Sequence, residues 1–182
     1  MTLQSLPKHF LLVVFLTSVS VSSSLTVRGQ AKGDADDRGS LAEIVNKRSA
    51  LLLVYRSSIV DVSDSDQAII EFVLKADPQP ARRYQTSYGV MAKKLNNYIR
   101  KYGSLSAAHI LEDADFVVFF NVIEYRRILN TTYPYGELFV IVKAIRGTQT
   151  RPHIIWKTKR LQWSGDAISD FIRALKSARH EG

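Results

Sequence analysis

The sequence predicts an α+β domain, with a mostly antiparallel sheet of about five strands and two amphipathic helices packed on one face. Three observations support this class. Several apolar runs have the length of a strand rather than a helix. The runs between residues 115 and 163 are joined by short connections, which favour antiparallel pairing. Two further segments, 81–102 and 166–179, carry apolar residues at helical spacing, so the expected order is β-β-α-β-β-β-α.

The first 31 residues are expected to form a secretory signal peptide. A basic residue precedes the apolar run 10–16, and small residues follow it, which is the pattern of such signals. The run is shorter than the roughly 20 apolar residues that a spanning helix needs. Gly29 and Ala31 favour cleavage before Lys32, and cleavage before Gln30 is the alternative. The protein is therefore expected in the periplasm or outside the cell, with no transmembrane span after cleavage.

Residues 32–49 are interpreted as a linker followed by a short helix. The linker is rich in glycine and aspartate. Ser40 is followed three residues later by Glu43, which is the pattern of a capping box at a helix start. From residue 50 to residue 182 we expect a single α+β domain.

The first two elements of that domain are predicted to be strands. Residues 50–60 hold a short apolar run with polar residues on both sides, and residues 61–66 are rich in Asp and Ser, as in turns. Residues 69–75 fit two patterns. Alternation of Ile70, Phe72 and Leu74 with charged residues indicates a strand, whereas Ile69 and Val73 would share a helix face. The strand is preferred because it would form a hairpin with residues 50–60.

The segment 81–102 is the clearest helix. Its aromatic and apolar residues recur every three or four positions and end at Gly103, a residue that often follows a helix. The members of this stripe are Tyr84, Tyr88, Met91, Leu95, Tyr98 and Tyr102.

The remaining elements follow in a regular series. The run 116–120 is apolar at every position, which indicates a central strand covered on both faces. The expected elements are a strand at 115–128, a loop at 130–136, a strand at 137–145, a turn at 147–152, a strand at 153–163 and a helix at 166–179.

Composition excludes several kinds of chemistry. The chain has no cysteine, so disulfides, thiolate metal sites, a cysteine nucleophile and lipid attachment through Cys are ruled out. We find no phosphate-binding loop, nucleophile elbow or zinc-protease motif, and the histidines show no ligand spacing. We therefore assign no catalytic residue, metal site or cofactor. The formal net charge of +8 falls to +6 when residues 1–31 are left out, because they hold Lys8 and Arg28 and no acid.

Two surfaces are candidates for binding. The first mixes tyrosine and guanidinium groups, a composition that is common in interfaces; its members are Glu124, Tyr125, Arg126, Arg127, Tyr133 and Tyr135. The second is basic and would contact an anionic polymer or membrane surface; its members are Arg151, Lys157, Lys159 and Arg160. Nucleic acid is not an expected partner for an exported protein.

The order of elements resembles that of small envelope domains. A helix over 95–102 is followed by the strand start Ala114-Asp115-Phe116-Val117-Val118, two further strands and a helix that begins near Ala167. This arrangement over residues 50–179 resembles the N-terminal domain of TolB and the related CsgG-type periplasmic domains, and also small exported bacterial proteins. This chain has Asn121 where those families usually have a glycine, and it lacks their lipidated Cys. The resemblance implies a non-catalytic role in an envelope assembly.

The sequence therefore predicts an exported, non-enzymatic domain that binds a protein or an envelope component. Two alternatives remain open. One is a hydrolase with a dispersed carboxylate and histidine site. The other is a basic module that adheres to an anionic polymer or a membrane surface.

Overall fold

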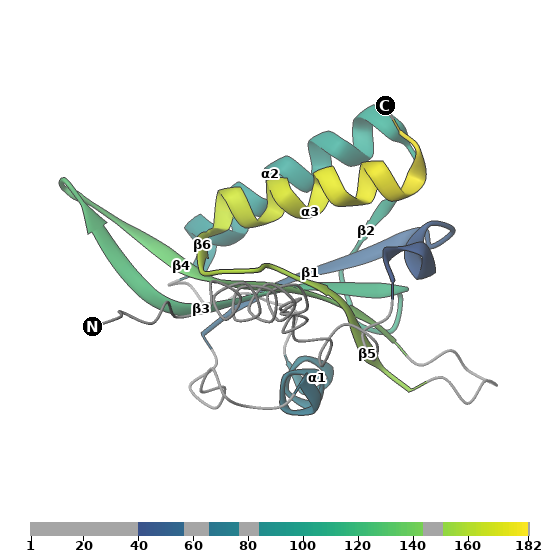
Figure 1. The fold of residues 1–182 in the computed structure, drawn as a ribbon, viewed down its shortest axis with the longest axis horizontal. Helices are drawn as coiled ribbons and strands as arrows, with labels where there is room; N and C mark the ends of the chain where they lie inside the picture. The colour runs from purple at the N-terminus through teal and green to yellow at the C-terminus, as the bar shows by residue number, and fades with distance from the viewer. Residues whose placement is uncertain (1–39, 57–65, 77–83, 144–150, 182) are drawn as a thin grey trace, which may run out of the picture. The chain divides into compact units, whose positions relative to one another are not determined.

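The computed structural model describes residues 40–56, 66–76, 84–143 and 151–181. Their centre is a mixed sheet of six strands in the order β2-β1-β3-β4-β5, with β6 paired to β4 (Figure 1). The predicted α+β class is confirmed. The elements are η1 (Leu41–Ile44), β1 (Ser49–Tyr55), α1 (Asp66–Lys75), α2 (Gln85–Tyr102), β2 (Ser106–Ala108), β3 (Phe116–Ile128), β4 (Thr131–Val142), β5 (His153–Lys157), β6 (Gln162–Trp163) and α3 (Ser164–Arg179).

Strand β3 forms the middle of the sheet. It runs parallel to β1 on one side and antiparallel to β4 on the other. Residues 116–120 are completely buried, as the all-apolar run predicted. The even-numbered members of this run face the helices α2 and α3, and the odd-numbered Val117 and Phe119 face a second core that includes residues of α1. Both faces are therefore covered, which explains why the run shows no alternation.

The strand expected at 69–75 is wrong, because this segment belongs to helix α1. Ile69, Ile70 and Val73 share one buried helix face and pack in the same core as Phe119. The expected hairpin with β1 does not form, since both edges of β1 are already paired, with β2 and with β3. The helix instead lies on the sheet face opposite α2 and α3 (Figure 1).

The loop expected at 130–136 is also wrong. Strand β4 begins at Thr131, so β3 and β4 are joined by the two residues Leu129 and Asn130. The ladder continues through the tyrosines because aromatic side chains suit strands and a two-residue connection is enough for a hairpin. The single strand expected at 153–163 is likewise interrupted, and the chain forms β5 and β6 with a break at residues 158–161. The break begins at Thr158, whose backbone N–H donates to the Leu138 carbonyl and whose hydroxyl oxygen accepts from the Leu138 N–H.

The two long helices are confirmed. Helix α2 begins at Gln85, ends before Gly103 at φ 65°, and buries Met91, Leu95 and Tyr98. Helix α3 buries Ile168, Phe171 and Leu175 completely. The two helices lie side by side on one face of the sheet, as expected (Figure 1).

The short helix after Ser40 is confirmed as a 3-10 helix, η1, and both hydrogen bonds of the capping box are present. Its Ile44 is fully buried in the core beneath α2 and α3.

Several predictions fall on residues that the structure does not describe. These are the signal peptide at 1–31, the linker up to residue 39, all but the last residue of the turn at 61–66, and the start of the turn at 147–152. The ends of the strands expected at 50–60 and 137–145 and the first residues of the helix expected at 81–102 also lie outside the described residues. Within the described ranges, none of the helices is both long enough and apolar enough to cross a membrane.

Candidate functional site

The most prominent surface feature is the far end of the β3–β4 hairpin, residues 122–136, which we call the hairpin arm. It projects beyond the helices and is seen at the left of Figure 1. Pairing between β1 and β3 stops at Asn121, and a bulge between Val122 and Glu124 changes the direction of β3. In the part of the chain that the structure describes, the arm beyond Tyr135 is a two-stranded ribbon.

One face of the hairpin arm carries four of the six predicted binding residues. Cross-strand pairs place Glu124 opposite Tyr135 and Arg126 opposite Tyr133. Arg126 forms an ion pair with Glu124, and its guanidinium carbon lies 4.5 Å from the centre of the Tyr135 ring. Tyr133 contacts Trp163 edge to face, with ring centroids 5.9 Å apart. The face is thus a preorganised set of aromatic and guanidinium groups, each contact contributing about 1 kcal/mol or less.

The other two predicted residues, Tyr125 and Arg127, do not belong to this face. They alternate with Glu124 and Arg126 along β3, so they occupy the opposite face of the arm. Both are exposed. The structure therefore divides the predicted group between two faces.

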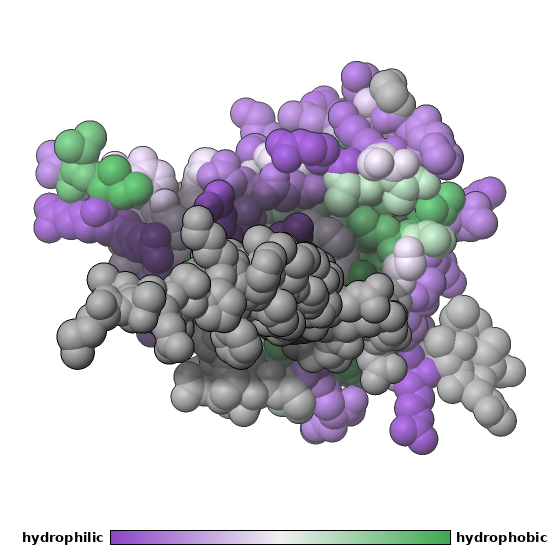
Figure 2. Space-filling view, in the orientation of Figure 1, coloured by the Kyte–Doolittle hydropathy of each residue, from purple (hydrophilic) through white to green (hydrophobic). Residues whose placement is uncertain are grey.

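The tip of the arm adds two residues that the sequence analysis did not select. Ile128 is 49% exposed and Leu129 is 91% exposed, and Figure 2 shows this apolar tip beside hydrophilic surface. Leu129 has a φ of 55°, a left-handed conformation that costs a non-glycine residue about 1 kcal/mol or more. Asn or Gly would suit this turn better. The signal was present in the sequence as two aliphatic residues directly before an Asn in a polar stretch.

The basic residues of the second candidate surface do not gather in one patch. Arg151 precedes β5, Lys157 ends it, and Lys159 and Arg160 lie in the connection to β6. Because the strand between them advances about 3.3 Å per residue, Arg151 is separated from the other three by the length of β5. The expected continuous face is also interrupted by the break after Lys157.

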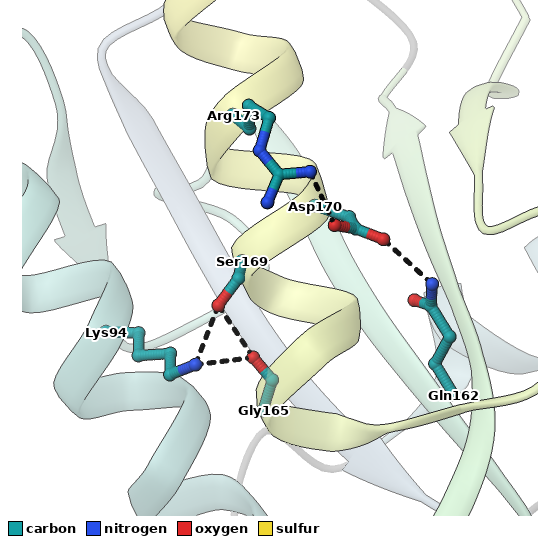
Figure 3. A network of polar contacts seen from close by, with 6 residues as sticks. All are labelled: Lys94, Gln162, Gly165, Ser169, Asp170 and Arg173. Atoms are coloured by element: carbon teal, nitrogen blue, oxygen red, sulfur yellow. Dashed lines mark hydrogen bonds and ion pairs between the residues drawn. The ribbon is translucent and has the colours of Figure 1, made fainter.

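Two clusters of polar side chains bear on the hydrolase alternative, one around His153 and one around Lys94 and Ser169, and neither supports it. His153 contacts the Arg151 carbonyl through Nδ1 at 2.9 Å and Glu43 through Nε2 at 2.8 Å, so both ring nitrogens are engaged. In Figure 3, Lys94 reaches from α2 to Ser169 and the Gly165 carbonyl on α3, each at 2.7 Å. Ser169 itself donates to that carbonyl, so its hydroxyl proton is not directed at a base. No group of three or more His, Asp or Glu suited to a metal ion occurs among the described residues.

Asp115, from the motif that resembles TolB, joins two strands. Its Oδ2 accepts hydrogen bonds from the backbone N–H of Arg48 at 2.8 Å and of Ser49 at 3.0 Å. Burial alone would raise the pKa of Asp115, but these hydrogen bonds outweigh it and lower the pKa below the ordinary value. The carboxylate therefore stabilises the neighbouring starts of β1 and β3.

A second group of polar contacts ties the end of α3 to the rest of the domain. Arg179 donates through Nη2 to the carbonyls of Ile44 and Lys47, at 2.9 and 2.7 Å. Glu181 accepts from the hydroxyl of Tyr98 at 2.5 Å and from that of Ser104 at 2.7 Å. Burial, together with the bond to Glu181, raises the pKa of Tyr98. These contacts connect segments far apart in the chain and have a structural role.

Comparison with known proteins adds no family to this description. No family model matches the chain, and no curated protein or solved structure matches it either. The resemblance to TolB and CsgG-type domains therefore stays a prediction.

Proposed function

We propose that this chain is an exported, non-enzymatic binding domain whose hairpin arm contacts a protein or a component of the cell envelope. The observation that carries the proposal is Leu129, a large apolar side chain at the tip of a projecting hairpin, exposed and in a strained backbone conformation. Neither the turn nor the core explains an aliphatic residue there. A side chain that is costly in the free domain is expected to be stabilised in a complex.

The composition of the arm supports the same proposal. Tyrosine and arginine are enriched in interfaces and supply much of their binding energy. Here Arg126 contacts Glu124 and Tyr135, so part of its side-chain entropy is already lost before binding. Export is supported by the signal-like first 31 residues.

Replacement of the tip tests this proposal without disturbing the core. A chain with Ile128→Ser and Leu129→Ser is compared with wild type for retention on immobilised envelope extract, and unchanged thermal unfolding verifies the fold. Ile110→Ser is the matched control, since Ile110 is an aliphatic side chain of similar exposure, 44%, outside the arm. We expect at least a tenfold loss of retention for the tip variant and less than a twofold change for the control.

The salt dependence separates this proposal from adhesion by basic residues. Contacts through an apolar tip persist at high ionic strength, whereas binding through exposed cations weakens steeply. Equal retention of wild type, tip variant and control would exclude the arm, and retention that disappears in high salt would favour the basic alternative. Export is tested separately by comparing where the full chain and a chain lacking residues 1–31 accumulate.

A further inference from the structure

An open groove of about 290 Å³ lies between helices α2 and α3 and shares no residue with the hairpin arm. Three lysines line it, Lys94 and Lys101 from α2 and Lys176 from α3. Hydroxyl and amide groups of Asn97, Tyr98, Tyr102 and Ser169 complete the polar lining, and Ile172 is its aliphatic member. None of the lining residues is acidic.

Two of the ammonium groups, those of Lys101 and Lys176, lie close to one aromatic ring, and none of the three lysines has a carboxylate counterion among the described residues. Lys101 Nζ lies 5.2 Å and Lys176 Nζ lies 5.0 Å from the centre of one ring, that of Tyr102. Lys94 contacts only the Gly165 carbonyl and the hydroxyl of Ser169 (Figure 3). Among the described residues, none of these lysines forms an ion pair with a carboxylate. Like charges brought together in this way repel one another, and a bound anion would relieve the repulsion.

Two acidic residues that follow lining residues of α3 in the chain, Asp170 and Glu181, are engaged elsewhere. Both carboxylate oxygens of Glu181 accept hydrogen bonds, Oε2 from Tyr98, which lines the groove, and Oε1 from Ser104. Asp170 accepts from Gln162 at 2.8 Å and from Arg173 at 3.1 Å, on the side of α3 that faces away from Lys94 (Figure 3). Neither carboxylate therefore neutralises the lysines of the groove.

The Tyr102 hydroxyl is affected by the same charges. The nearby ammonium group of Lys176, and after it that of Lys101, lower the pKa of Tyr102 below its ordinary value. A positive potential that favours a phenolate also favours an oxyanion at this position.

We infer that the groove between α2 and α3 binds a small anion that carries a phosphate group. Lysine is a common phosphate ligand that acts as a point charge, and Lys101 and Lys176 together match the charge of about −2 on a phosphate monoester. The volume lies just below the roughly 300–1,000 Å³ of small-molecule pockets. It accommodates a phosphate and a small organic body, for which the Tyr102 ring and Ile172 provide apolar contact.

The inference is tested by calorimetric titration of the full chain with inorganic pyrophosphate. The groove variant is Lys101→Gln with Lys176→Gln. The control is Lys93→Gln with Lys75→Gln, which removes the same charge from exposed positions outside the groove and outside both candidate binding surfaces. We expect the groove variant to lose at least tenfold in affinity and the control to stay within twofold of wild type, with unchanged thermal unfolding in both.

A parallel arm distinguishes a soluble ligand from a lipid headgroup. The same proteins are sedimented with phosphatidylglycerol vesicles and with phosphatidylcholine vesicles. Loss of phosphatidylglycerol binding in the groove variant alone would identify the headgroup as the source of the phosphate. Absence of both pyrophosphate and vesicle binding in wild type would overturn the inference. An equal loss in the groove variant and the control would also overturn it, because net charge would then explain the binding.

Discussion

Substitution of Asp115 by alanine should lower the free energy of unfolding by about 2–3 kcal/mol. The carboxylate accepts two backbone N–H groups, at 2.8 and 3.0 Å, where β1 and β3 begin. A hydrogen bond to a charged group contributes about 1.5–3 kcal/mol. The bond from Arg48 lies at an exposed position, so the Arg48 N–H can bond water when the carboxylate is removed. The expected cost of losing both hydrogen bonds is therefore well below twice the upper value of that range. Asp115→Asn keeps an acceptor without the charge and should cost about 1 kcal/mol.

The effect should depend on pH with a defined sign. The pKa of Asp115 is lowered in the folded protein relative to the ordinary value of 3.8. The folded state therefore gains stability when the carboxyl ionises. This contribution is complete above the unfolded pKa and is lost as the pH falls through the lower, folded pKa.

Urea unfolding at pH 7 and again near pH 2–3 measures both effects. The difference between wild type and Asp115→Ala should be largest at pH 7 and should shrink at the acidic end. Asp113→Ala is the control, because Asp113 is exposed and its backbone carbonyl, not its carboxylate, accepts the bond from Ser49. We expect a change within about 0.5 kcal/mol for it. A difference below about 0.5 kcal/mol for Asp115→Ala at pH 7, or one independent of pH, would refute the reasoning.

Two glycines and one arginine provide further tests. Gly136→Ala would place its Cβ 1.9 Å from the Asn121 carbonyl oxygen, so we expect a loss of about 3 kcal/mol or more and a lower Tm. Gly89→Ala meets no atom within 4 Å in α2 and should gain about 0.5–1 kcal/mol; equal Tm values for the two variants would contradict both expectations. Arg179→Met removes the donors to Ile44 and Lys47 and should cost about 2–3 kcal/mol, with faster hydrogen exchange around Ile44. Unchanged exchange there would show that η1 is held by its apolar contacts alone.

Helices and strands were predicted correctly where the spacing of residues within the element itself indicates its type. The stripe from Tyr84 to Tyr102 repeats at helical spacing, and most of its members are buried as that spacing implied. The capping box at Ser40 depends on residues three positions apart and formed as expected. The apolar run of β3 identified a central strand because a strand buried on both faces is apolar at every position.

Where a segment's sequence fits two kinds of secondary structure, contacts with segments distant in the chain determine which one forms. Residues 69–75 satisfy both periodicities, and they form a helix because β2 and β3 occupy the edges of β1 while the second face of the sheet needs an apolar cover. Tyr133 and Tyr135 were expected in a loop. Their place in β4 depends on the cross-strand ladder with Arg126 and Glu124.

The candidate site shows the same division. Composition was enough to select the Tyr and Arg residues of the hairpin arm, and the structure brings Glu124, Arg126, Tyr133 and Tyr135 onto one face. It was not enough to select Leu129, because an exposed aliphatic residue and a buried one are identical in sequence. The three lysines of the groove were also missed, since Lys94 and Lys101 come from one helix and Lys176 from another about 75 residues away.

By itself the sequence determined the α+β class, the two long amphipathic helices, the buried central strand and the absence of thiol chemistry. These depend on composition and on spacing within one element. The tertiary structure alone decided the parallel pairing of β1, the helix α1, the division of the last strand and the position of Leu129 at an exposed tip. The physical reason is that strand pairing and burial depend on which distant segments occupy each edge and face of the sheet. The periodicity within a short segment does not indicate which distant segments these are.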